Sequence, residues 1–286
     1  MNNTYPRTLF CVVPVHNRIN ATRRFLDQIC RQKNIEFRLI IVDDGSKDGT
    51  SAMLRSYTEL PIQIVKGSGK LWWGGGMRLG MKVAHAQMHE QDALLMLNDD
   101  IEIDDDFLAR LAYQARTLGP YAVIGCQQRD LTTGQQPFFG YTIDFLRCRL
   151  DMLRCVPTLT SVVSVDALCG RGTLFSNAVV RRIGYINSRK FPHFWGDIEI
   201  TARAKDAGFL VVCDPSTIVS TSFQASDQQR LGGNRLRVLL SPVSSRNILQ
   251  HFLFWLSCGP GYLRWTAILR FPAIKMWRTL KLSISG

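Results

Sequence analysis

A dense group of acidic side chains follows a short apolar segment near the middle of the sequence. The apolar segment ends at Leu97, after which come Asp99, Asp100 and Glu102, and then three aspartates at 104–106. Like charges this close repel one another unless solvent, a helix start or a cation compensates them. The aspartates at 104–106 directly precede a helical pattern, so a helix start explains them. It does not explain Asp99 and Asp100, which are candidates for cation binding.

Two further polar clusters follow apolar segments in the same way. The stretch PVHNR, residues 14–18, follows the apolar residues 8–13, and DDGSKDGT, residues 43–50, follows residues 38–42. Aspartate and serine also cap helices, which is the simple structural explanation for the second cluster. If the apolar segments are parallel strands, all three clusters meet at one edge of the sheet, where ligands of such sheets bind.

The elements that would position these clusters alternate along the chain. Apolar runs with turn residues after them predict strands at 8–13, 38–42, 62–65, 93–97 and 121–125. Helical patterns lie between them, at 20–32, from near Gly75, and at 106–117. This alternation predicts an α/β fold with a mostly parallel central sheet and helices on both faces, as in Rossmann-like proteins.

A pair of carboxylates at a strand end suits a hard divalent cation. Mg²⁺ usually takes one or two protein carboxylates and fills its other positions with water and phosphate oxygens. Asp99 and Asp100 therefore suggest that the missing partner is a nucleoside diphosphate.

Composition excludes several other classes of protein. The chain has 286 residues, and its apolar content of 46% is ample for a folded core. Its start lacks the pattern of a signal peptide, and no uncharged apolar run is long enough to cross a bilayer. The eight cysteines form no CxxC pair, which favours buried, reduced thiols in a cytoplasmic protein.

The positive charge of the chain is concentrated at its C-terminal end. Between Gln228 and Gly286 there are nine Arg or Lys residues and no Asp or Glu, whereas residues 1–227 are nearly neutral. We therefore expect a catalytic domain at 1–227 and a basic, amphipathic helical extension at 228–286.

The extension has the pattern of a helix lying on anionic lipid. On a helical projection one side carries the cations Arg264, Arg270, Lys275, Arg278 and Lys281. The opposite side carries Tyr262, Trp265, Leu269, Met276 and Leu280. Pro272 predicts a kink between two segments. The alternative is an ordinary helical cap on the sheet.

The order of the motifs resembles an inverting family 2 glycosyltransferase with the GT-A fold. PVHNR, VDDGS and NDD are followed by CGRGTLF at 169–175 and by FWGDIEI at 194–200, with Arg203 and Gly208 after it. Together the matching segments span about residues 8–220, and as an ordered set they are specific. The LWWGGG loop at 71–76 and the GRGTL segment are most similar to rhamnosyltransferase-type relatives.

The resemblance implies a role for each matching residue. In the nucleotide-sugar site, Pro14, His16 and Asn17 would contact the nucleotide, while Asp43 and Asp44 would hold base and ribose. Asn98, Asp99 and Asp100 match a DxD-type motif, in which Asp100 would bind Mg²⁺ or Mn²⁺ and Asp99 would face ribose or donor sugar. Gly170, Arg171, Gly172 and Trp195 would contact the acceptor or the sugar.

Asp197 matches the aspartate that serves as general base. It would take a proton from the acceptor hydroxyl in a single displacement that inverts the anomeric centre. The structural alternative is an acid in the first turn of a helix. Glu199 and Arg203 are four residues apart, so a helix-surface ion pair is expected for them.

The sequence departs from the family pattern at three places. Gly196 replaces a Glu found in many relatives, and Ser220, Thr221 and Ser222 stand where many have a metal-binding His. The third departure is the LWWGGG loop, in which Trp73, Gly75 and Arg78 could serve the diphosphate. The two tryptophans fit core packing equally well.

The resemblance implies transfer of a sugar, from dTDP-rhamnose or a UDP-sugar, to a lipid-linked glycan in cell-surface polysaccharide synthesis. Such an enzyme would be peripheral at the cytoplasmic face of the membrane. The alternatives are a nucleotidyltransferase or a basic α/β protein that binds nucleic acid or membrane without transferring sugar. The excess of basic over acidic residues lies mostly outside the sheet domain and no nucleic-acid motif is present, so we expect no nucleic-acid partner.

Overall fold

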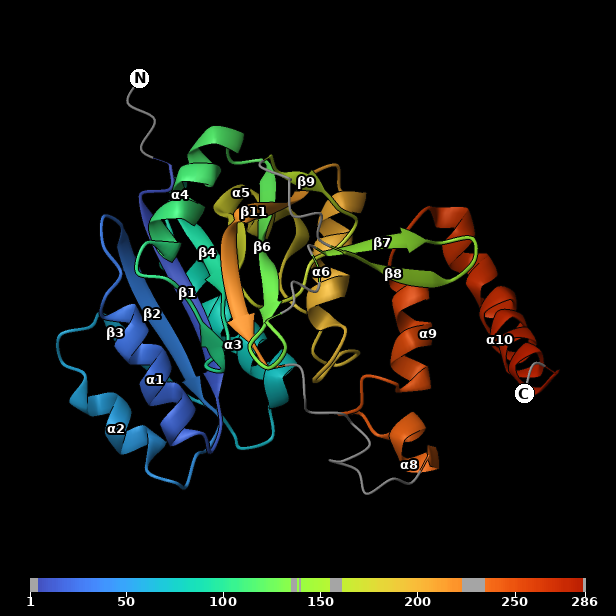
Figure 1. Ribbon diagram of the computed structural model, residues 1–286, viewed down its shortest axis with the longest axis horizontal. Helices are drawn as coiled ribbons and strands as arrows, with labels where there is room; N and C mark the ends of the chain where they lie inside the picture. The colour runs from blue at the N-terminus through green and yellow to red at the C-terminus, as the bar shows by residue number, and fades with distance from the viewer. Residues whose placement is uncertain (1–4, 135–137, 139, 155–160, 223–234, 285–286) are drawn as a thin grey trace.

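Figure 1 shows the computed structural model, which describes residues 5–134, 138, 140–154, 161–222 and 235–284. For residue 235 and residues 275–284 only the backbone is described. A layered α/β part occupies one side of the molecule, and a group of helices from the C-terminal extension lies beside it (Figure 1). The domain boundary expected after residue 227 lies outside the described residues.

A nine-stranded sheet forms the centre of the described part of the chain. Eight strands follow one another in the order β3-β2-β1-β4-β10-β6-β11-β5, and β9 pairs with β11. Their bounds are β1 Thr8–Val15, β2 Glu36–Asp43, β3 Ile62–Lys66, β4 Ala93–Met96, β5 Ile101–Glu102, β6 Ala122–Asp130, β9 Val163–Ser164, β10 Thr173–Ser176 and β11 Leu210–Thr221.

The first four strands are parallel and in matching register. Val15 at the end of β1 lies opposite Asp43 at the end of β2, and Val12 lies opposite Met96 in β4. The segments after these strands therefore begin at the same edge of the sheet. The five strands expected from the sequence are all present.

The second half of the sheet is mixed. β10 is antiparallel to both of its neighbours, β4 and β6, while β11 is parallel to β6 and antiparallel to β5. β10 brings the CGRGTLF segment into the centre of the sheet, because Thr173 pairs with Met96. The GRG segment thereby ends, at Gly172, beside the end of β4.

Helices cover both faces of the sheet, as expected. One layer contains α1 Ile19–Ile29, α2 Thr50–Ser56 and α4 Phe107–Leu118. The other contains α3 Trp72–His85, α5 Asn177–Ile183 and α6 Gly196–Asp206. Alternate residues of β1 divide between the two layers, with Leu9 in the first and Phe10 in the second. Such alternation follows from the two-residue period of a strand.

The aspartates at 104–106 do precede a helix, and arginines also compensate them. Asp106 is the N-cap residue of α4, yet its side chain makes no capping hydrogen bond. Arg110 instead pairs with Asp104 at 2.7 Å and with Asp106 at 3.1 Å. Arg31 pairs with Asp105 at 2.9 Å. These acids are thus accounted for without a metal ion.

The described cysteines are free thiols. Six of the seven are buried, as expected, and Cys30 is exposed. Cys155 lies outside the described residues.

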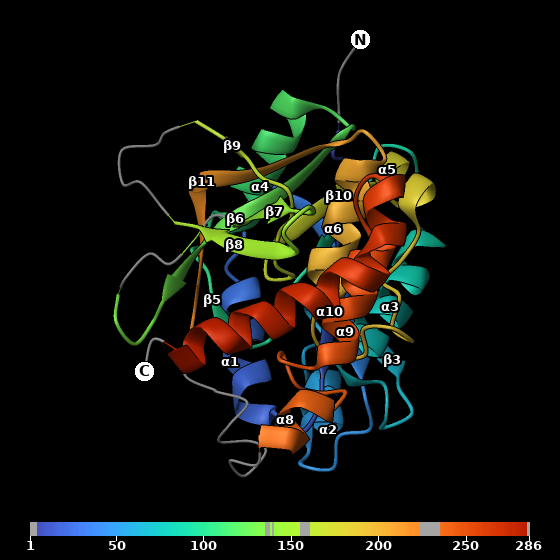
Figure 2. The same ribbon diagram turned by 90° about the vertical axis from the view of Figure 1, so that its right-hand side faces the viewer.

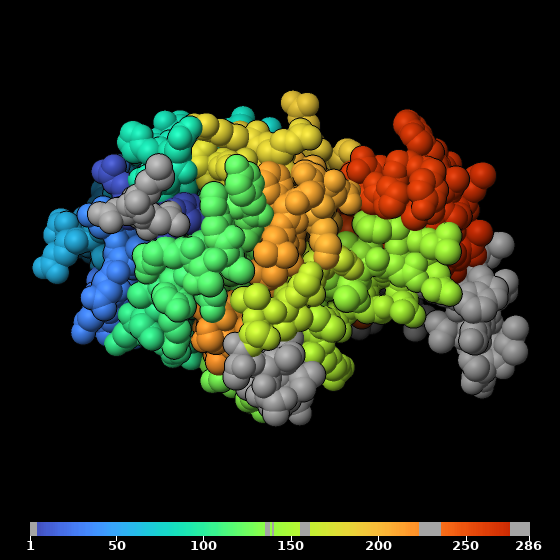
Figure 3. Space-filling model, turned by 90° about the horizontal axis from the view of Figure 1, so that it is seen from above, coloured from blue at the N-terminus to red at the C-terminus, as the bar shows by residue number. Residues whose placement is uncertain are grey.

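The C-terminal extension is helical and packs against a small hairpin and α6. The hairpin consists of β7 Gly140–Asp144 and β8 Arg149–Leu153, and the helices are α8 Arg235–Leu240, α9 Ile248–Ser257 and α10 Gly261–Ile284. A third hydrophobic cluster joins Phe254 and Trp255 of α9 to Phe271 of α10 and to Phe191. These helices lie at the end of the molecule opposite α2 and β3 (Figures 1 and 3).

The last helix contains Pro272 and is continuous through it. Figure 2 shows that its path changes direction partway along, which a proline inside a helix ordinarily causes. None of the helices in the described part of the chain combines the length and apolar character needed to cross a bilayer.

The expected distribution of charge on α10 is wrong for two of its arginines. Arg264 pairs with Asp206 of α6 at 3.1 Å. Arg270 donates to the carbonyls of Phe145 and Leu146 in the hairpin loop, at 2.7 and 2.6 Å. Both arginines therefore hold the helix to the protein. The side chains of Lys275, Arg278 and Lys281 lie outside the described residues, as do those of Met276 and Leu280.

Candidate functional site

The Asp44 carboxylate anchors the loop that leads into α3. One of its oxygens accepts from the backbone N–H of Gly69 at 2.7 Å, and the other from those of Leu71 and Trp72 at 2.8 and 3.2 Å. Asp44 is buried. Its charge thus orders the start of the helix that carries both tryptophans.

His16 and Asn17 tie the loops after β1 and β2 together. The Nδ1 of His16 lies 2.6 Å from the Asp44 carbonyl oxygen, which can only accept, so Nδ1 carries the proton. Nε2 then accepts from the Asn17 side chain at 3.0 Å. The Asn17 side-chain oxygen accepts from the backbone N–H of Lys47 at 2.7 Å. These residues thus fix the geometry of the edge.

Asp43 has a similar role within its own loop. Its carboxylate accepts from the backbone N–H of Ser46 at 2.9 Å and from the hydroxyl of Ser51. Asp43 is buried beneath the edge. The carboxylates of Asp43 and Asp44, which are expected to hold base and ribose, thus both accept hydrogen bonds from the protein itself.

Arg18 compensates the two carboxylates at the end of β4. Its guanidinium lies 3.2 Å from an oxygen of Asp99 and 3.0 Å from an oxygen of Asp100. The hydroxyl of Thr22 also donates to Asp99, at 2.8 Å. Burial raises the pKa of Asp99 to about 6, although Arg18 and Thr22 act to lower it. In this structure, the positive charge beside these two acids is thus the guanidinium of Arg18.

Asp100 also has an oxygen suited to a metal ion. Its Oδ1 is buried and has no hydrogen-bond partner among the described residues. In the same part of the chain, no three His, Cys, Asp or Glu side chains come together. Thr221, where many relatives have His, donates to the backbone carbonyl of Asp100 at 3.1 Å. One carboxylate fits Mg²⁺ or Mn²⁺ only if substrate phosphate and water complete the coordination.

Trp73 connects the end of β4 to the segment around Asp197. Its indole N–H donates to the side-chain oxygen of Asn98 at 2.9 Å. Its ring lies against Gly170, where an added Cβ would come within 2.5 Å of the ring. The backbone N–H of Gly170 in turn donates to the Asp197 carboxylate at 2.8 Å. Trp73 is also packed against the core, which is one of the two roles that the sequence left open for it.

Asp197 lies in the first turn of α6, where its charge is both desolvated and stabilised. Burial raises its pKa, while the backbone N–H groups of Gly170 and Ile198 and the charge of Arg171 act to lower it. The N–H of Ile198 is 2.9 Å from the second carboxylate oxygen. A carboxylate with a raised pKa is a better proton acceptor than an ordinary aspartate.

A cavity of about 380 Å³ opens beside these groups. Four of the predicted residues line it, namely Pro14, His16, Asp44 and Trp73. It is also lined by Arg18, Trp72 and His193, which the sequence reasoning missed as site residues. Arg18 stands inside the PVHNR motif, which was a usable signal. His193 gave none, because its place follows from the path of the chain before α6.

Some predicted residues lie elsewhere. Gly75 is buried inside α3, and its N–H bonds to Leu71 within the helix start. Arg78 points away from the Asp44 cavity and donates to the carbonyl of Ile186 at 2.7 Å. The indole N–H of Trp195 bonds to the carbonyl of Ser245 at 3.0 Å. The structure does not bring Arg78 to the cavity that contains Asp44.

The glycines around Arg171 allow close contacts. Gly172 has φ +83°, and its N–H bonds to the carbonyl of Met96 at 2.9 Å. An added Cβ at Gly172 would lie 2.7 Å from the sulfur of Cys126. The GRG segment is thus held tightly between β4 and β6, next to Asp197.

Glu199 and Arg203 form an ion pair, as expected, but it is not a surface pair. Glu199 is buried, and Arg203 binds its carboxylate through two nitrogens at 3.0 and 3.1 Å. Arg203 also donates to the carbonyls of Ile183 and Tyr185. This network fixes the segment before α6.

The family model described as "Glycosyl transferase family 2" matches residues 10–168, more than half of the chain. The chain belongs to glycosyl transferase family 2. The chain is 35% identical over 82 residues to an uncharacterized glycosyltransferase of Rickettsia typhi. The matched part is 28% of this chain and 24% of that relative, so the match spans about a quarter of the relative's length.

Solved glycosyltransferases show the same GT-A fold. The crystal structure of GalNAc-T7 with UDP, GalNAc and Mn²⁺ has a TM-score of 0.64 at 13% identity, covering 76% of this chain and 44% of that one. The mannosyltransferase PcManGT of Pyrobaculum calidifontis, in complex with GDP-Man and Mn²⁺, has a TM-score of 0.62 at 14% identity. The match covers 94% of this chain and 72% of that one. S. aureus TarS 1–349 in complex with UDP has a TM-score of 0.55 at 14% identity, and the match covers 85% of this chain and 69% of that one.

Replacing Arg18 with Gln in this protein should destabilise the fold more at pH 8 than at pH 4. Arg18 compensates Asp99 only while that carboxylate is ionised, and its folded-state pKa is about 6. Above that pH the loss should be about 1 kcal/mol, a small value because Arg18 is partly exposed; below it, Asp99 is protonated and its share of the loss disappears. Urea unfolding at both pH values measures this difference.

Two variants serve as controls for that experiment. Arg18→Lys keeps the charge and should lose less, while Arg31→Gln removes an exposed ion pair with Asp105 and should change little at either pH. An equal loss for Arg18→Gln at pH 4 and pH 8 would show that the arginine acts through packing.

Proposed function

We propose that this protein transfers a sugar from a nucleoside diphosphate sugar to a glycan acceptor, with inversion at the anomeric carbon. In this proposal Asp197 is the general base, Asp100 binds the metal ion, and the cavity lined by Asp44 and Trp73 receives the donor. Membership of the family supports sugar transfer itself. The donor, the acceptor and the stereochemical course belong to the proposal.

One observation carries the assignment of roles. Trp73 contacts the strand-end motif through Asn98 and the base candidate through Gly170. The indole therefore contacts both the strand-end motif and the segment that orients the base candidate. In an inverting displacement the leaving group and the attacking hydroxyl lie on opposite sides of the sugar carbon, so we assign the metal ion to the first of these segments and the base to the second.

The residues at the end of β4 would help to neutralise the negative charge of the departing diphosphate. Asp100, with its unpaired buried oxygen, would hold Mg²⁺ or Mn²⁺, which neutralises charge on the departing diphosphate. Arg18, which lines the same cavity as Asp44, can donate to phosphate oxygens from the other side. GalNAc-T7 and PcManGT contain Mn²⁺.

Asp197 would remove the proton from the acceptor hydroxyl as its oxygen attacks. Its carboxylate is already oriented by the N–H groups of Gly170 and Ile198. Because burial raises its pKa, the proton affinity of Asp197 is closer to that needed at neutral pH. Because position 196 is Gly, the residue before Asp197 provides no second carboxylate.

For the donor we propose dTDP-rhamnose or a UDP-sugar. UDP is present in the GalNAc-T7 and TarS structures, whereas PcManGT is in complex with GDP-Man, so the base varies among proteins of this fold. Trp72, which is half exposed, and His193 form an edge-to-face pair at the cavity, 6.0 Å between ring centres. These rings offer a surface on which a base or a sugar can stack.

For the acceptor we propose a lipid-linked glycan, which α10 would help to reach. Tyr262, Trp265 and Leu269 of α10 are 72%, 77% and 77% exposed, and Ile268 is half exposed. Such rings and apolar chains favour the boundary between water and lipid. The extension has no acidic residue, which favours anionic lipid. In this version of the anchor, aromatic residues enter the lipid, while Arg264 and Arg270 hold the helix to the protein.

Mn²⁺ together with the true sugar nucleotide should stabilise the wild-type protein. A ligand at about 100 times its Kd adds about 2.7 kcal/mol to the free energy of unfolding. Asp100→Ala should lose the part of this stabilisation that requires Mn²⁺, because its carboxylate would be the metal ligand. Thermal unfolding with a panel of sugar nucleotides, with and without Mn²⁺, measures both effects.

Asp105→Ala is the matched control, since it removes an exposed acid from the same run that pairs with Arg31. It should leave the response to Mn²⁺ unchanged. An unchanged response in Asp100→Ala as well would remove the metal assignment.

Asp197→Asn should keep donor binding and lower kcat by about 10²- to 10⁴-fold, the usual contribution of a general base. The wild-type rate should rise with pH through a pKa above that of an ordinary aspartate, because the base acts only when deprotonated and burial raises its pKa. Steady-state kinetics and donor titration separate the two effects.

Asp151→Asn, which alters an exposed hairpin carboxylate paired with Arg149, is the control and should turn over normally. If Asp197→Asn loses donor affinity as strongly as turnover, the residue is structural.

Trp265→Ser combined with Leu269→Ser should weaken binding to anionic phosphatidylglycerol vesicles by at least about tenfold, because two large apolar side chains no longer enter the lipid. Both are well exposed, so the fold should persist. Co-sedimentation at low and high salt measures the partition.

Tyr113→Ser with Leu210→Ser, which are exposed apolar residues on α4 and β11, is the control pair and should bind vesicles normally. Full-length protein that ignores anionic vesicles at low salt would contradict the anchor. A dimer that the α10 variant disrupts would assign this face to a second copy of the chain.

A further inference from the structure

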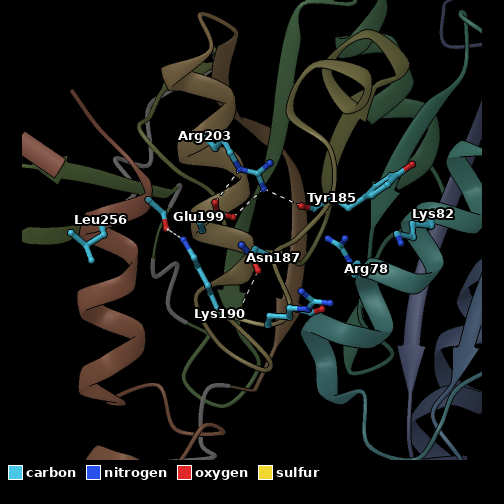
Figure 4. A pocket seen from close by; sticks show the side chains of 11 residues that line it. Arg78, Lys82, Tyr185, Asn187, Lys190, Glu199, Arg203 and Leu256 are labelled. Atoms are coloured by element: carbon cyan, nitrogen blue, oxygen red, sulfur yellow. Dashed lines mark hydrogen bonds and ion pairs between the residues drawn. The ribbon is translucent and has the colours of Figure 1, made fainter. Parts of the chain in front are cut away.

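A second large cavity lies on the far side of α3 from the Asp44 loop. It has a volume of about 780 Å³ and opens between α3, the segment 185–190, α6 and the end of α9 (Figure 4). Its lining residues are Arg78, Lys82, Tyr185, Asn187, Ser188, Arg189, Lys190, Glu199, Arg203, Leu256 and Ser257. This volume is typical of a ligand site.

The cavity is strongly positive. Five of its lining residues are basic and one, Glu199, is acidic. Glu199 is fully engaged by Arg203, which binds both of its oxygens. That ion pair is neutral. Four other cations line the cavity and pair with no carboxylate of the described residues: Arg78, Lys82, Arg189 and Lys190.

The protein itself satisfies only part of these donors. Arg78 donates through one nitrogen to the carbonyl of Ile186 at 2.7 Å, and the ammonium of Lys190 donates to the hydroxyl of Ser257 at 3.1 Å. Neither contact involves a negative charge. Among the described residues, no ion pair involves Lys82 or Arg189.

This arrangement differs from that of the other charges in the fold. Asp99, Asp104 and Asp106 each have an arginine within 3.2 Å. Around the cavity, like charges instead converge from α3 and from the segment 185–190, as Figure 4 shows for Arg78, Lys82 and Lys190. An anion from outside the chain would relieve their mutual repulsion more than solvent alone.

We propose that this cavity binds a phosphate or diphosphate group. Lysine and arginine provide several N–H donors and no acceptor, and phosphate provides several acceptor oxygens and about −1.5 to −2 charge near pH 7. The site is separate from the donor cavity, with which it shares no lining residue.

α9 contributes an apolar side chain to the cavity, and this indicates which kind of molecule carries the phosphate. Leu256 lines the cavity, and Leu253 and Leu249 follow it at helical spacing towards the start of α9. Leu249 is exposed. An apolar track beside a phosphate site suits a prenyl phosphate, and that source rests on the lipid-linked acceptor proposed above. A free phosphate anion uses the cations alone.

Two connections link this cavity to the donor site. Asp197 and Glu199 share the first turn of α6, about 200° apart, so that one faces Gly170 and the other the cavity. The segment that lines the cavity continues to Pro192, whose carbonyl accepts from Gly74 at 2.8 Å, and to His193 in the donor cavity. An anion in the cavity thus orders a segment that both sites share.

Calorimetric titration with inorganic pyrophosphate, in EDTA and without sugar nucleotide, tests the site directly. Lys82→Gln with Arg189→Gln should raise the Kd for pyrophosphate at least about tenfold, since two charge-assisted contacts are lost. Both residues are exposed, and thermal unfolding checks that the fold persists. The control is Lys33→Gln with Arg116→Gln, which removes the same charge from exposed positions elsewhere and should leave the Kd within about twofold.

A second arm identifies the source of the phosphate. Farnesyl diphosphate that binds more tightly than pyrophosphate supports a prenyl-linked ligand, and equal binding supports a free anion. Lys82→Arg with Arg189→Lys keeps both charges and should keep binding. Equal affinities in the cavity variant and in the control variant would overturn the site. Because no sugar is transferred in these titrations, the outcome is independent of the proposed transferase reaction.

Discussion

The geometry of the donor side depends on the hydrogen bonds that the Asp44 carboxylate accepts. Three backbone N–H groups of residues 69–72 point at one buried negative charge, which fixes where α3 begins. From that start, Trp73 reaches Asn98, and its ring lies against Gly170. Charge-assisted bonds to a buried carboxylate are strong and directional. Without these hydrogen bonds, the start of α3 would not be fixed, and Trp73 would not be held in contact with both the strand-end motif and the segment that binds Asp197.

A second constraint is the balance of charge at the edge. Arg18 holds two carboxylates that would otherwise repel each other, and it also faces the cavity beside Asp44. In the absence of ligand, the Arg18 side chain stabilises the protein through these ion pairs. In the proposed complex, the same side chain would contact phosphate. The site is therefore preorganised by the groups that a substrate would engage, which lowers the cost of ordering them on binding.

The sequence predicted the parallel half of the fold well, because its signals are local. Each of the first strands is a short apolar run followed by turn residues, and their polar ends do meet at one edge. The antiparallel place of β10 was not predicted, since it depends on a pairing with β4 that no local pattern encodes. The family motifs include Gly170 and Asp197, but they did not predict the hydrogen bond between these two residues or the Trp73 indole that bonds to Asn98.

Charge was the least predictable property. Arg78 and Arg203 read as a site residue and a surface partner, yet each donates to backbone carbonyls near residues 183–186. Arg264 and Arg270 likewise face the protein, although helical spacing placed them on an outer face. A projection shows which residues share a side of a helix. It does not show which side meets the protein, because that depends on carbonyls and acids contributed by distant segments.

The position of β10 also affects how the protein is made. On the ribosome the N-terminal strands emerge first, and β4 can pair with β1 as soon as residue 96 is free. Its other edge stays open until residues 173–176 have been synthesised, because β10 is the strand that covers it. An exposed, apolar strand edge is a site of aggregation. The nascent chain thus carries an open apolar strand edge through the synthesis of almost eighty further residues, and a chaperone acting in that interval would protect β4.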